Sequence, residues 1–248
     1  MKAMIFAAGL GTRLKPITDT IPKALLPLGG KTLLQYQIEK LREVAITEIV
    51  INVHHFPDQI ISYLEENHGF GCNIQISDER DFLLDTGGGL RKAASLLGTE
   101  SSILACNVDI LSNIDIQAFV ASHHANSLAT LVVSERDTQR YLLFNQENKM
   151  IGWTNISTGE FRPKEIALKA EESYCKLAFS GMQILSPRIF SLMDKVVKEK
   201  GDKFSLIDLY LSVCQSETIQ AFIPQDYRMM DVGKIAQLRE AEIFAESL

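Results

Sequence analysis

The sequence predicts an α/β fold: a doubly wound, mixed but mainly parallel sheet of Rossmann-like type with a small antiparallel β insertion. Strand-like and helix-like segments alternate through the first 135 residues, which is typical of parallel strands joined by crossover helices. Brief strands separated by polar turns fill residues 141–163, and amphipathic helices dominate after residue 187. We expect one domain, residues 1–248, because 46% hydrophobic content can enclose a single large core and no linker interrupts the chain.

The first half alternates short apolar runs with amphipathic segments. Runs rich in β-branched and apolar residues predict strands at 2–7, 48–53, 72–77, 101–108 and 128–134. Helices are predicted at 32–44, 57–69, 89–98 and 115–125. In the first of these, Leu34, Ile38 and Leu41 form one apolar stripe opposite charged residues, and Pro57 begins the second. Folds of this type bind ligands at the carboxyl ends of their strands, so this half should hold a nucleotide.

The second half begins with a different pattern. The segments 141–144, 149–154 and 159–163 predict antiparallel hairpins laid against the parallel sheet, where they would form the wall of a second pocket. Strands are then predicted at 178–185 and 218–223, and helices at 187–201, 205–216 and 233–248. Trp153 lies in the hairpin region, where core packing and stacking on a sugar ring are both open to it.

Charge and cysteine content exclude several classes of protein. The chain carries 25 basic and 31 acidic residues, and no stretch concentrates Lys or Arg as nucleic acid or an anionic membrane surface would require. The four cysteines lie far apart without a C-x-x-C pair, which argues against a disulfide framework or zinc knuckle. The apolar stretch near Met1 is too short for a signal peptide or membrane span. We expect a cytoplasmic monomer or small homo-oligomer that binds neither nucleic acid nor membrane.

A glycine loop follows the first predicted strand. In "FAAGLGTRLKP", Gly9 and Gly11 let backbone N–H groups approach a bound anion, and Arg13 offers a charged planar fork for phosphate oxygens. The loop lacks the third glycine of the dinucleotide fingerprint and the G-K-[ST] of a P-loop. These features favour a loop for a polyphosphate chain, and a tight turn with a solvated arginine is the alternative.

Three further charged residues lie in segments suited to phosphate and metal binding. Lys23 is framed by Pro22 and Pro27, which restrict where its ammonium group can go. Asp109 ends an apolar run, at the edge of the sheet where open α/β folds bind ligands. A carboxylate there suits Mg²⁺, and an Asp in an ordinary strand-to-loop turn is the alternative. Asp231 precedes a helical stripe and is also a good N-cap, and one carboxylate can serve both purposes. We expect the two carboxylates to converge on one divalent cation.

Five motifs in order resemble those of the sugar-1-phosphate nucleotidyltransferases. They are "FAAGLGTRLKPIT", "IPKALLPLGGKTLLQYQIEKL", "LLDTGGGLRKAASLLG", "NVDIL" and "MDVGKIAQLREAE", and they span nearly the whole chain. The triple glycine and the short length look most like the N-acetylmuramate α-1-phosphate uridylyltransferases of cell-wall recycling, with guanylyltransferases of mannose or heptose 1-phosphate next. The resemblance implies the nucleotide-diphospho-sugar transferase fold, with a nucleotide-binding half at 1–135 and a sugar-phosphate-binding half at 136–248.

The resemblance also assigns roles to individual residues. It implies that the nucleotide contacts Ala7, Ala8, Gly9, Gly11, Thr12, Arg13, Thr86, Gly87 and Gly88. It implies that Arg13, Lys23 and Asp109 are catalytic and that Mg²⁺ is shared by Asp109 and Asp231. The sugar phosphate would contact Gly89, Glu165 and Lys176. Two features depart from the family pattern: Val108 stands where relatives usually have Gly or Ser, and no aromatic residue directly precedes Asp231.

The predicted reaction transfers a nucleoside monophosphate from a nucleoside triphosphate to a sugar 1-phosphate and releases pyrophosphate. The sugar 1-phosphate is mostly dianionic at neutral pH, so its oxygen can attack the α-phosphate without a protein base. Catalysis then depends on positioning and on neutralisation of charge by Arg13, Lys23 and Mg²⁺.

The expected substrate pair is UTP with N-acetylmuramate 1-phosphate, and GTP with mannose or heptose 1-phosphate is the alternative. A non-catalytic sensor of nucleotide sugars is a rival of another class, because a fold can keep its pocket after losing its chemistry. An NAD-dependent oxidoreductase is a weaker rival. It needs an acidic residue about 20 residues past the loop, and Lys23 lies in that region instead.

Overall fold

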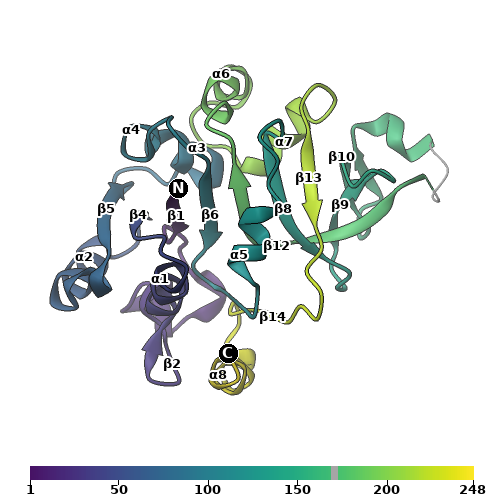
Figure 1. Cartoon of the computed structure of the whole chain (residues 1–248). Helices are drawn as coiled ribbons and strands as arrows, with labels where there is room; N and C mark the ends of the chain where they lie inside the picture. Colours follow the sequence, from purple (N-terminus) through teal and green to yellow (C-terminus); the bar gives the residue numbers. More distant parts are fainter. Residues whose placement is uncertain (169–172) are drawn as a thin grey trace.

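Residues 1–168 and 173–248 are described in this computed structural model, and they build a ten-stranded sheet with helices on both faces (Figure 1). The strand order is β11-β10-β9-β12-β6-β1-β4-β5, and β8 and β13 join it through β12. The strands are β1 (Lys2–Phe6), β4 (Glu48–Val53), β5 (Asn73–Asp78), β6 (Ile103–Asn107), β8 (Ala129–Ser134), β9 (Arg140–Phe144), β10 (Met150–Asn155), β11 (Glu160–Arg162), β12 (Cys175–Leu185) and β13 (Ile219–Phe222). The predicted mixed sheet is confirmed.

The part of the sheet around β1 is parallel. β1 pairs in parallel with β4 on one side and with β6 on the other, and β5 pairs in parallel with β4. Within β1, Ala3 and Ile5 belong to one core cluster, whereas Met4 and Phe6 belong to another. Successive side chains of a strand point to opposite faces, so β1 is apolar throughout because both faces are covered.

Two sets of helices supply that cover. The helices are α1 (Leu33–Glu43), α2 (Pro57–Glu66), α3 (Asp85–Lys92), α4 (Ala94–Leu97), α5 (Ile116–Ala121), α6 (Ile189–Lys200), α7 (Leu206–Val213) and α8 (Leu238–Glu246). Residues of α1, α2, α5 and α8 pack with Ala3 and Ile5, and residues of α3, α4, α6 and α7 pack with Met4 and Phe6. Figure 1 shows α3, α4, α6 and α7 above the sheet and α1, α2 and α8 below it. The doubly wound arrangement is therefore confirmed.

The predicted hairpins form the antiparallel end of the sheet. β9 pairs with β10, and β10 pairs with β11, both in antiparallel register. The long strand β12 is antiparallel to β6, β8 and β9, so it joins these hairpins to the parallel strands. The hairpins lie at the right of Figure 1, at the opposite end of the sheet from β5.

Two small ribbons are absent from the sequence prediction. β2 (Pro27–Leu28) pairs with β3 (Lys31–Thr32), and β7 (Ile110–Ser112) pairs with β14 (Met229–Asp231), each in antiparallel register. Strands of two or three residues are too short to show an alternating pattern, so contacts distant in the sequence decide their pairing. Asp231 ends a strand, and the N-cap of the next helical turn is Lys234, so the N-cap interpretation of Asp231 is wrong.

Three predicted helices differ by four or five residues at one end, and one of them, expected at 233–248, begins as α8 at Leu238 after a 3₁₀ turn. The helix expected at 89–98 begins at Asp85, includes all three glycines and continues after Ala93 as α4. The helix expected at 115–125 ends at Ala121, and the Asp115 side chain accepts a hydrogen bond from the Ala118 N–H as its N-cap. Glycine disfavours a helix, so local propensity alone does not predict the early start of α3. Packing against another segment, described below, stabilises it.

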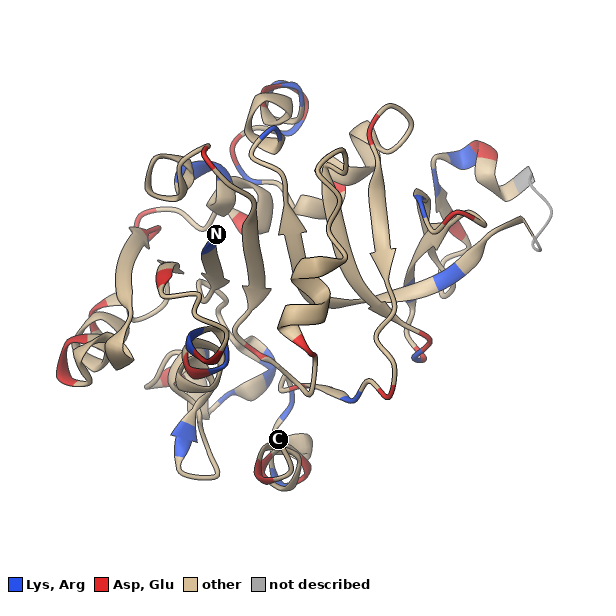
Figure 2. Cartoon of the chain, viewed as in Figure 1, with Lys and Arg blue, Asp and Glu red and all other residues tan. Residues whose placement is uncertain are grey.

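Charged residues of both signs are interspersed along the fold, as Figure 2 shows. Within residues 1–168 and 173–248, no helix has the length and apolar character needed to cross a bilayer.

Candidate active site

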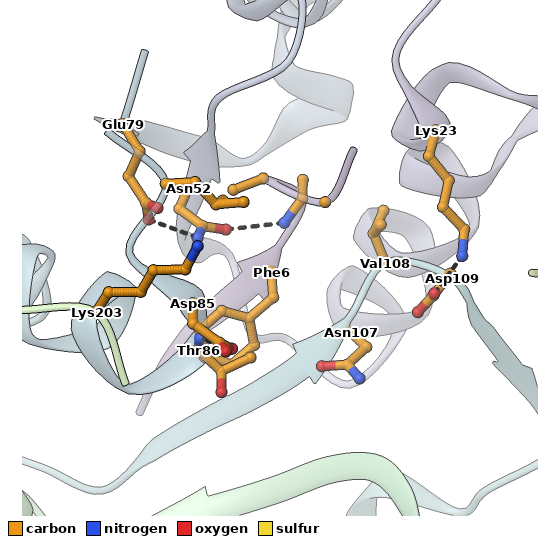
Figure 3. Close-up of a pocket in the computed structure, with 14 residues that line it drawn as sticks. Phe6, Lys23, Asn52, Glu79, Asp85, Thr86, Asn107, Val108, Asp109 and Lys203 are labelled. Carbon is orange, nitrogen blue, oxygen red and sulfur yellow. Dashed lines mark hydrogen bonds and ion pairs between the residues drawn. The ribbon is translucent and has the colours of Figure 1, made fainter. Parts of the chain in front are cut away.

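A cleft of about 370 Å³ opens at the carboxyl ends of β1, β4 and β6 (Figure 3). Its lining contains Ala7, Ala8 and Gly9 directly after β1, Thr86 from α3, and Asp109, two residues after the end of β6. Parallel strands of an open α/β sheet present their ligand sites at this edge. Five residues that the sequence assigned to the nucleotide or the metal therefore line one cavity.

Two buried polar side chains hold the loop after β1. The Asn52 Oδ1 atom accepts a hydrogen bond from the Ala7 N–H at 2.8 Å, and its Nδ2 donates to Glu79 at 2.7 Å (Figure 3). The fully buried Glu79 carboxylate also accepts from the Leu84 N–H at 3.1 Å. Burial raises the pKa of Glu79, and the hydrogen bonds from Asn52 and Leu84 oppose this shift without cancelling it. These bonds tie three segments together at the floor of the cleft.

The two glycines of the first loop have different roles. Gly11 has a φ of +63°, and a Cβ at this position would lie 2.8 Å from Cγ2 of Thr18. Gly11 is therefore required by backbone conformation and by close packing. A Cβ on Gly9 would meet no atom within 4 Å, and Gly9 lines the cleft. Glycine at position 9 keeps the cavity open, as a loop that approaches a ligand requires.

The ribbon of β7 and β14 brings the two candidate metal ligands together. Asp231 is the residue of β14 that pairs with Ile110 of β7, and the Val232 N–H donates to the Asp109 carbonyl at 2.9 Å. From α1, the buried Gln37 side chain donates to the Ile110 carbonyl at 2.6 Å and so holds the ribbon on its other side. Asp109, directly before β7, and Asp231, the last residue of β14, thus lie on neighbouring segments of the ribbon, and that their carboxylates share one cation stays a prediction.

Lys23 has a carboxylate partner. Its ammonium group forms an ion pair with Asp109, and the Lys23 side chain is buried while the Asp109 side chain keeps 24% of its surface exposed (Figure 3). Lys23 begins a 3₁₀ turn, Lys23–Leu25, whose N-cap is Pro22. The prolines around Lys23 thus fix a turn that directs the lysine into the protein, where its positive charge balances the negative charge of the Asp109 carboxylate.

Arg13 lies close to Asp231 around Gly233. A Cβ on Gly233 would lie 2.8 Å from Nη2 of Arg13 and 2.9 Å from Oδ1 of Asp231. Both side chains therefore approach the same bare backbone position. Glycine is required at this position of the "DVG" segment because any larger residue would displace the guanidinium group or the carboxylate.

A second cleft, of about 830 Å³, adjoins the first at Asp85, which lines both. Its lining contains Arg13 and Asp231 together with side chains from the antiparallel hairpins and α7. Among these are Arg136, Arg140, Tyr141, Trp153, Arg162 and Asp208. Asp109 lines the first cleft and Asp231 the second, so the ribbon borders both cavities.

Several residues of the predicted site lie outside both linings. Gly87, Gly88 and Gly89 are buried in α3, and the N–H groups of Gly87 and Gly88 donate to the Phe204 carbonyl at 2.9 and 3.1 Å. The Thr86 hydroxyl accepts from the Leu206 N–H at 3.0 Å. The glycines thus let α3 pack closely against the segment before α7, and a nucleotide contact by them stays a prediction.

Four other predicted positions also lie outside the linings of the two clefts. Gly11 is the N-cap of the 3₁₀ turn Thr12–Leu14 that follows β1, and Thr12 is the first residue of that turn. Glu165 is exposed on the 3₁₀ turn Lys164–Leu168. Lys176 lies on β12 opposite Leu143 of β9. Ligand contacts by these residues remain predictions.

The residues at the ribbon fit a hard divalent cation. Asp109 and Asp231 offer carboxylate oxygens, which Mg²⁺ prefers, and Mg²⁺ in enzymes of this kind takes one or two carboxylates and completes its octahedron with water and substrate phosphate. Within the described ranges, no cluster of three or more His, Cys, Asp or Glu side chains could hold a metal by itself. This donor set suits a metal that binds together with phosphate.

Sequence reasoning missed the polar residues Asn52 and Glu79 and three of the four arginines of the second cleft. Asn52 lies next to the last residue of β4, and its place at the carboxyl end of a parallel strand could have identified it. Arg136, Arg140 and Arg162 recur through the hairpin region, and this local excess of guanidinium groups was the available signal.

Comparison with known proteins gives a family match over the whole chain. Residues 2–247 match the family model described as "Nucleotidyl transferase". The N-acetylmuramate alpha-1-phosphate uridylyltransferase of Neisseria meningitidis serogroup B is 31% identical over 249 residues, 99% of this chain and 98% of that protein. The protein of the same name from Caulobacter vibrioides is 42% identical over 109 residues, 43% of this chain and 45% of that protein. The second match thus spans less than half of the relative.

Other relatives match a smaller share of the sequence or share the fold. A mannose-1-phosphate guanyltransferase of Gibberella zeae is 32% identical over 145 residues, 57% of this chain and 40% of that protein. The crystal structure of HddC from Yersinia pseudotuberculosis, complexed with GMP-PN, has a TM-score of 0.75 at 22% identity and covers 98% of this chain and 99% of that one. At that identity the likeness shows the fold. On the full-length family match, the chain belongs to the nucleotidyl transferase family, a family of enzymes.

Proposed function

We propose that this protein transfers the uridylyl group of UTP to N-acetylmuramate 1-phosphate, releases pyrophosphate and uses Mg²⁺. The observation that carries the proposal is the pairing of β7 with β14, which sets Asp109 beside Asp231 between two clefts. The choice of substrates is supported by the two uridylyltransferases of this name, one of which aligns with 99% of the chain.

The two cavities suggest that each substrate binds in its own cleft. The nucleoside triphosphate is assigned to the first cleft, where the loop Ala7–Gly9 and Thr86 offer backbone and hydroxyl groups to the base and ribose. The sugar 1-phosphate is assigned to the second cleft, whose lining has aromatic side chains and arginines. The reacting phosphates would then meet near the ribbon, with Arg13 and Asp231 on one side and Lys23 and Asp109 on the other.

Asp109 and Asp231 would hold Mg²⁺, which, when bound, neutralises negative charge on the phosphate oxygens as the reaction proceeds. Lys23 holds the Asp109 carboxylate in a fixed position through its ion pair. Arg13 offers a guanidinium fork beside Asp231 for the β- and γ-phosphates. These residues gather and orient two polyanions, which is the main requirement of phosphoryl transfer.

The reaction itself needs no proton transfer by the protein. An oxygen of the dianionic sugar phosphate forms a new bond to the α-phosphorus, in line with the bond to the bridging oxygen. The bond between the α-phosphorus and the bridging oxygen breaks, and its electron pair leaves with pyrophosphate. The two clefts on either side of Asp109 and Asp231 suit this in-line arrangement.

A pyrophosphate-release assay tests the proposal. UTP, GTP, CTP, dTTP and ATP would each be combined with the 1-phosphates of N-acetylmuramate, N-acetylglucosamine, mannose and heptose in the presence of Mg²⁺. We expect the highest kcat/KM for UTP with N-acetylmuramate 1-phosphate and loss of turnover when EDTA removes the metal. Fastest turnover of GTP with mannose or heptose 1-phosphate would support a guanylyltransferase instead. Tight binding of a nucleotide sugar without pyrophosphate release from any pair would identify a sensor.

A further inference from the structure

The second cleft contains more arginines than one sugar phosphate requires. Its lining includes four arginines, Arg13, Arg136, Arg140 and Arg162. Arg13 lies at the ribbon beside Asp231, where the proposed function assigns it to the reacting phosphates. The other three come from the segment 136–162, away from the ribbon along the chain. What these three arginines bind is a separate question.

Arg162 is balanced by its surroundings. Its Nε donates to Glu160 at 2.7 Å, and its Nη1 lies 4.0 Å from an Asp208 carboxylate oxygen. Its guanidinium also lies over the ring of Trp153, 5.0 Å from the centroid. Two carboxylates and an aromatic face therefore occupy Arg162, which serves to build the wall of the cleft.

Arg136 and Arg140 have no such balance. In the described part of the chain, neither of them forms an ion pair with a carboxylate, and both line the cleft. Nη2 of Arg136 donates to the Phe179 carbonyl at 3.0 Å, whereas its buried Nε has no hydrogen-bond partner. Arg140 is exposed at the start of β9. Leaving a buried donor unpaired is costly, so the guanidinium group of Arg136 would gain from an acceptor that enters the cleft.

The same cleft offers aromatic surfaces for a sugar ring. Tyr141 follows Arg140 on β9 and pairs with Thr154 of β10, whereas the neighbouring Trp153 pairs with Leu142, and both aromatic residues line the cleft. Aromatic side chains present an apolar face and suit the apolar face of a pyranose. A sugar held there would keep its 1-phosphate toward Asp231 and present its other substituents to Arg136 and Arg140.

We propose that Arg136 and Arg140 form a subsite for a carboxylate carried by the sugar of the sugar 1-phosphate, so that the enzyme selects acidic sugars. A guanidinium fork matches a carboxylate with two parallel hydrogen bonds, and the reacting phosphate is already served by Arg13 and the ribbon. The inference rests on the proposed function and deepens it: muramate bears a carboxylate that glucosamine lacks.

The test compares two sugars that differ in that group. We expect the Arg140→Ala substitution to raise KM for N-acetylmuramate 1-phosphate at least tenfold more than KM for N-acetylglucosamine 1-phosphate, since a charge-assisted bidentate contact typically contributes that much. Arg140→Lys should lie between wild type and Arg140→Ala, because it keeps the charge without the fork. Arg136→Ala should shift the same ratio, with melting temperature measured to separate recognition from folding.

The matched control is Arg188→Ala, which removes an exposed arginine paired with Glu217 outside both clefts, and its ratio should equal that of wild type. Equal increases of KM for both sugars in Arg140→Ala would show that the arginine binds the shared phosphate, and unchanged KM values for both sugars would show that it binds neither group; either result overturns the subsite.

Calorimetric binding of the two sugar 1-phosphates to the unmodified protein and to Arg140→Ala keeps this test independent of turnover. If the nucleotide or the sugar of the proposed function is wrong, a carboxylate preference lost in the variant still supports the subsite. If wild type binds both sugars equally, the subsite is refuted even where uridylyl transfer is observed.

Discussion

Asp109 has two different partners within a few ångströms. Its side chain pairs with the buried Lys23, and its carbonyl accepts the N–H of Val232, the neighbour of Asp231. One residue therefore connects the lysine, the ribbon and the second carboxylate. The lysine holds the carboxylate in place, because a buried ammonium group with no partner would be unfavourable.

The Asp109→Asn substitution keeps the size of the side chain and removes its charge. We expect a fall in kcat of about a hundredfold or more, equivalent to about 2 to 3 kcal/mol of transition-state stabilisation. Steady-state pyrophosphate release measures the rate, and circular dichroism tests whether the fold is retained. Near-normal turnover of a folded variant would remove Asp109 from the mechanism.

Gly233→Ala tests the approach of Arg13 and Asp231 to one backbone position. The added methyl group would lie 2.8 Å from Nη2 of Arg13 and 2.9 Å from Oδ1 of Asp231, both at the ends of flexible side chains. These ends can move aside, so we expect a melting temperature close to wild type and a kcat at least tenfold lower. If kcat is unchanged, the two side chains do not need their observed positions for catalysis.

At the scale of elements, α3 and the chain before α7 are held together by glycine. The N–H groups of Gly87 and Gly88 donate to the Phe204 carbonyl, and a Cβ on Gly88 would lie 2.2 Å from the Asp202 carbonyl oxygen. Backbone meets backbone here, so neither side can yield by rotating a side chain. The contact also positions Asp85 and Thr86, which line the first cleft.

The Gly88→Ala substitution tests this contact, because the higher helix propensity of alanine stabilises α3 whereas its methyl group would collide with residue 202. In an exposed helix the change would stabilise the protein by up to about 1 kcal/mol. At Gly88 we expect the opposite sign, a loss of about 2 kcal/mol or more in the free energy of unfolding, because α3 must move away from residue 202. Urea unfolding gives the sign directly. A stabilised variant with a raised KM for nucleotide would favour the predicted ligand contact over the packing role.

The stability of the whole molecule depends on pH through a half-buried lysine, Lys40. Lys40 of α1 donates to the Ser112 hydroxyl at 3.1 Å and also to the Ser112 carbonyl, behind the ribbon. Burial lowers the pKa of Lys40 to about 8, and Cys106 and Glu43, which also face it, raise the value slightly. Burial raises the pKa of Cys106 to about 12, so that thiol stays neutral in this range.

The sign of the pH effect follows from the two pKa values of Lys40. The folded value, about 8, lies below the 10.5 of a free lysine, so between these values the unfolded chain binds more protons than the folded one. The free energy of unfolding of wild type should therefore rise, relative to Lys40→Met, by on the order of 2 kcal/mol as pH increases from 8 to 10.5. Urea unfolding at pH 7.5 and pH 10 measures the difference. Parallel curves for the two proteins would contradict the lowered pKa.

The parallel part of the fold was open to prediction from the sequence because its signals are local. The strand predicted at 48–53 has these limits in the structure, and the one predicted at 2–7 begins where expected and ends one residue earlier, at Phe6. A parallel strand covered on both faces reads as a continuous apolar run, and a helix over a sheet reads as an apolar stripe. The glycine loop and Asp109 were found for the same reason, since each follows such a strand.

The sequence by itself determined the doubly wound sheet, the family motifs and the charged residues at the strand ends. Only the tertiary structure decided that Asp109 and Asp231 lie side by side, that Lys23 pairs with Asp109 and that Arg136 and Arg140 share a cleft with Trp153. The reason is the range of the interactions: periodicity records which face a residue turns to the core, whereas the partner of a three-residue strand or a single charge is set by contacts between segments far apart in the chain.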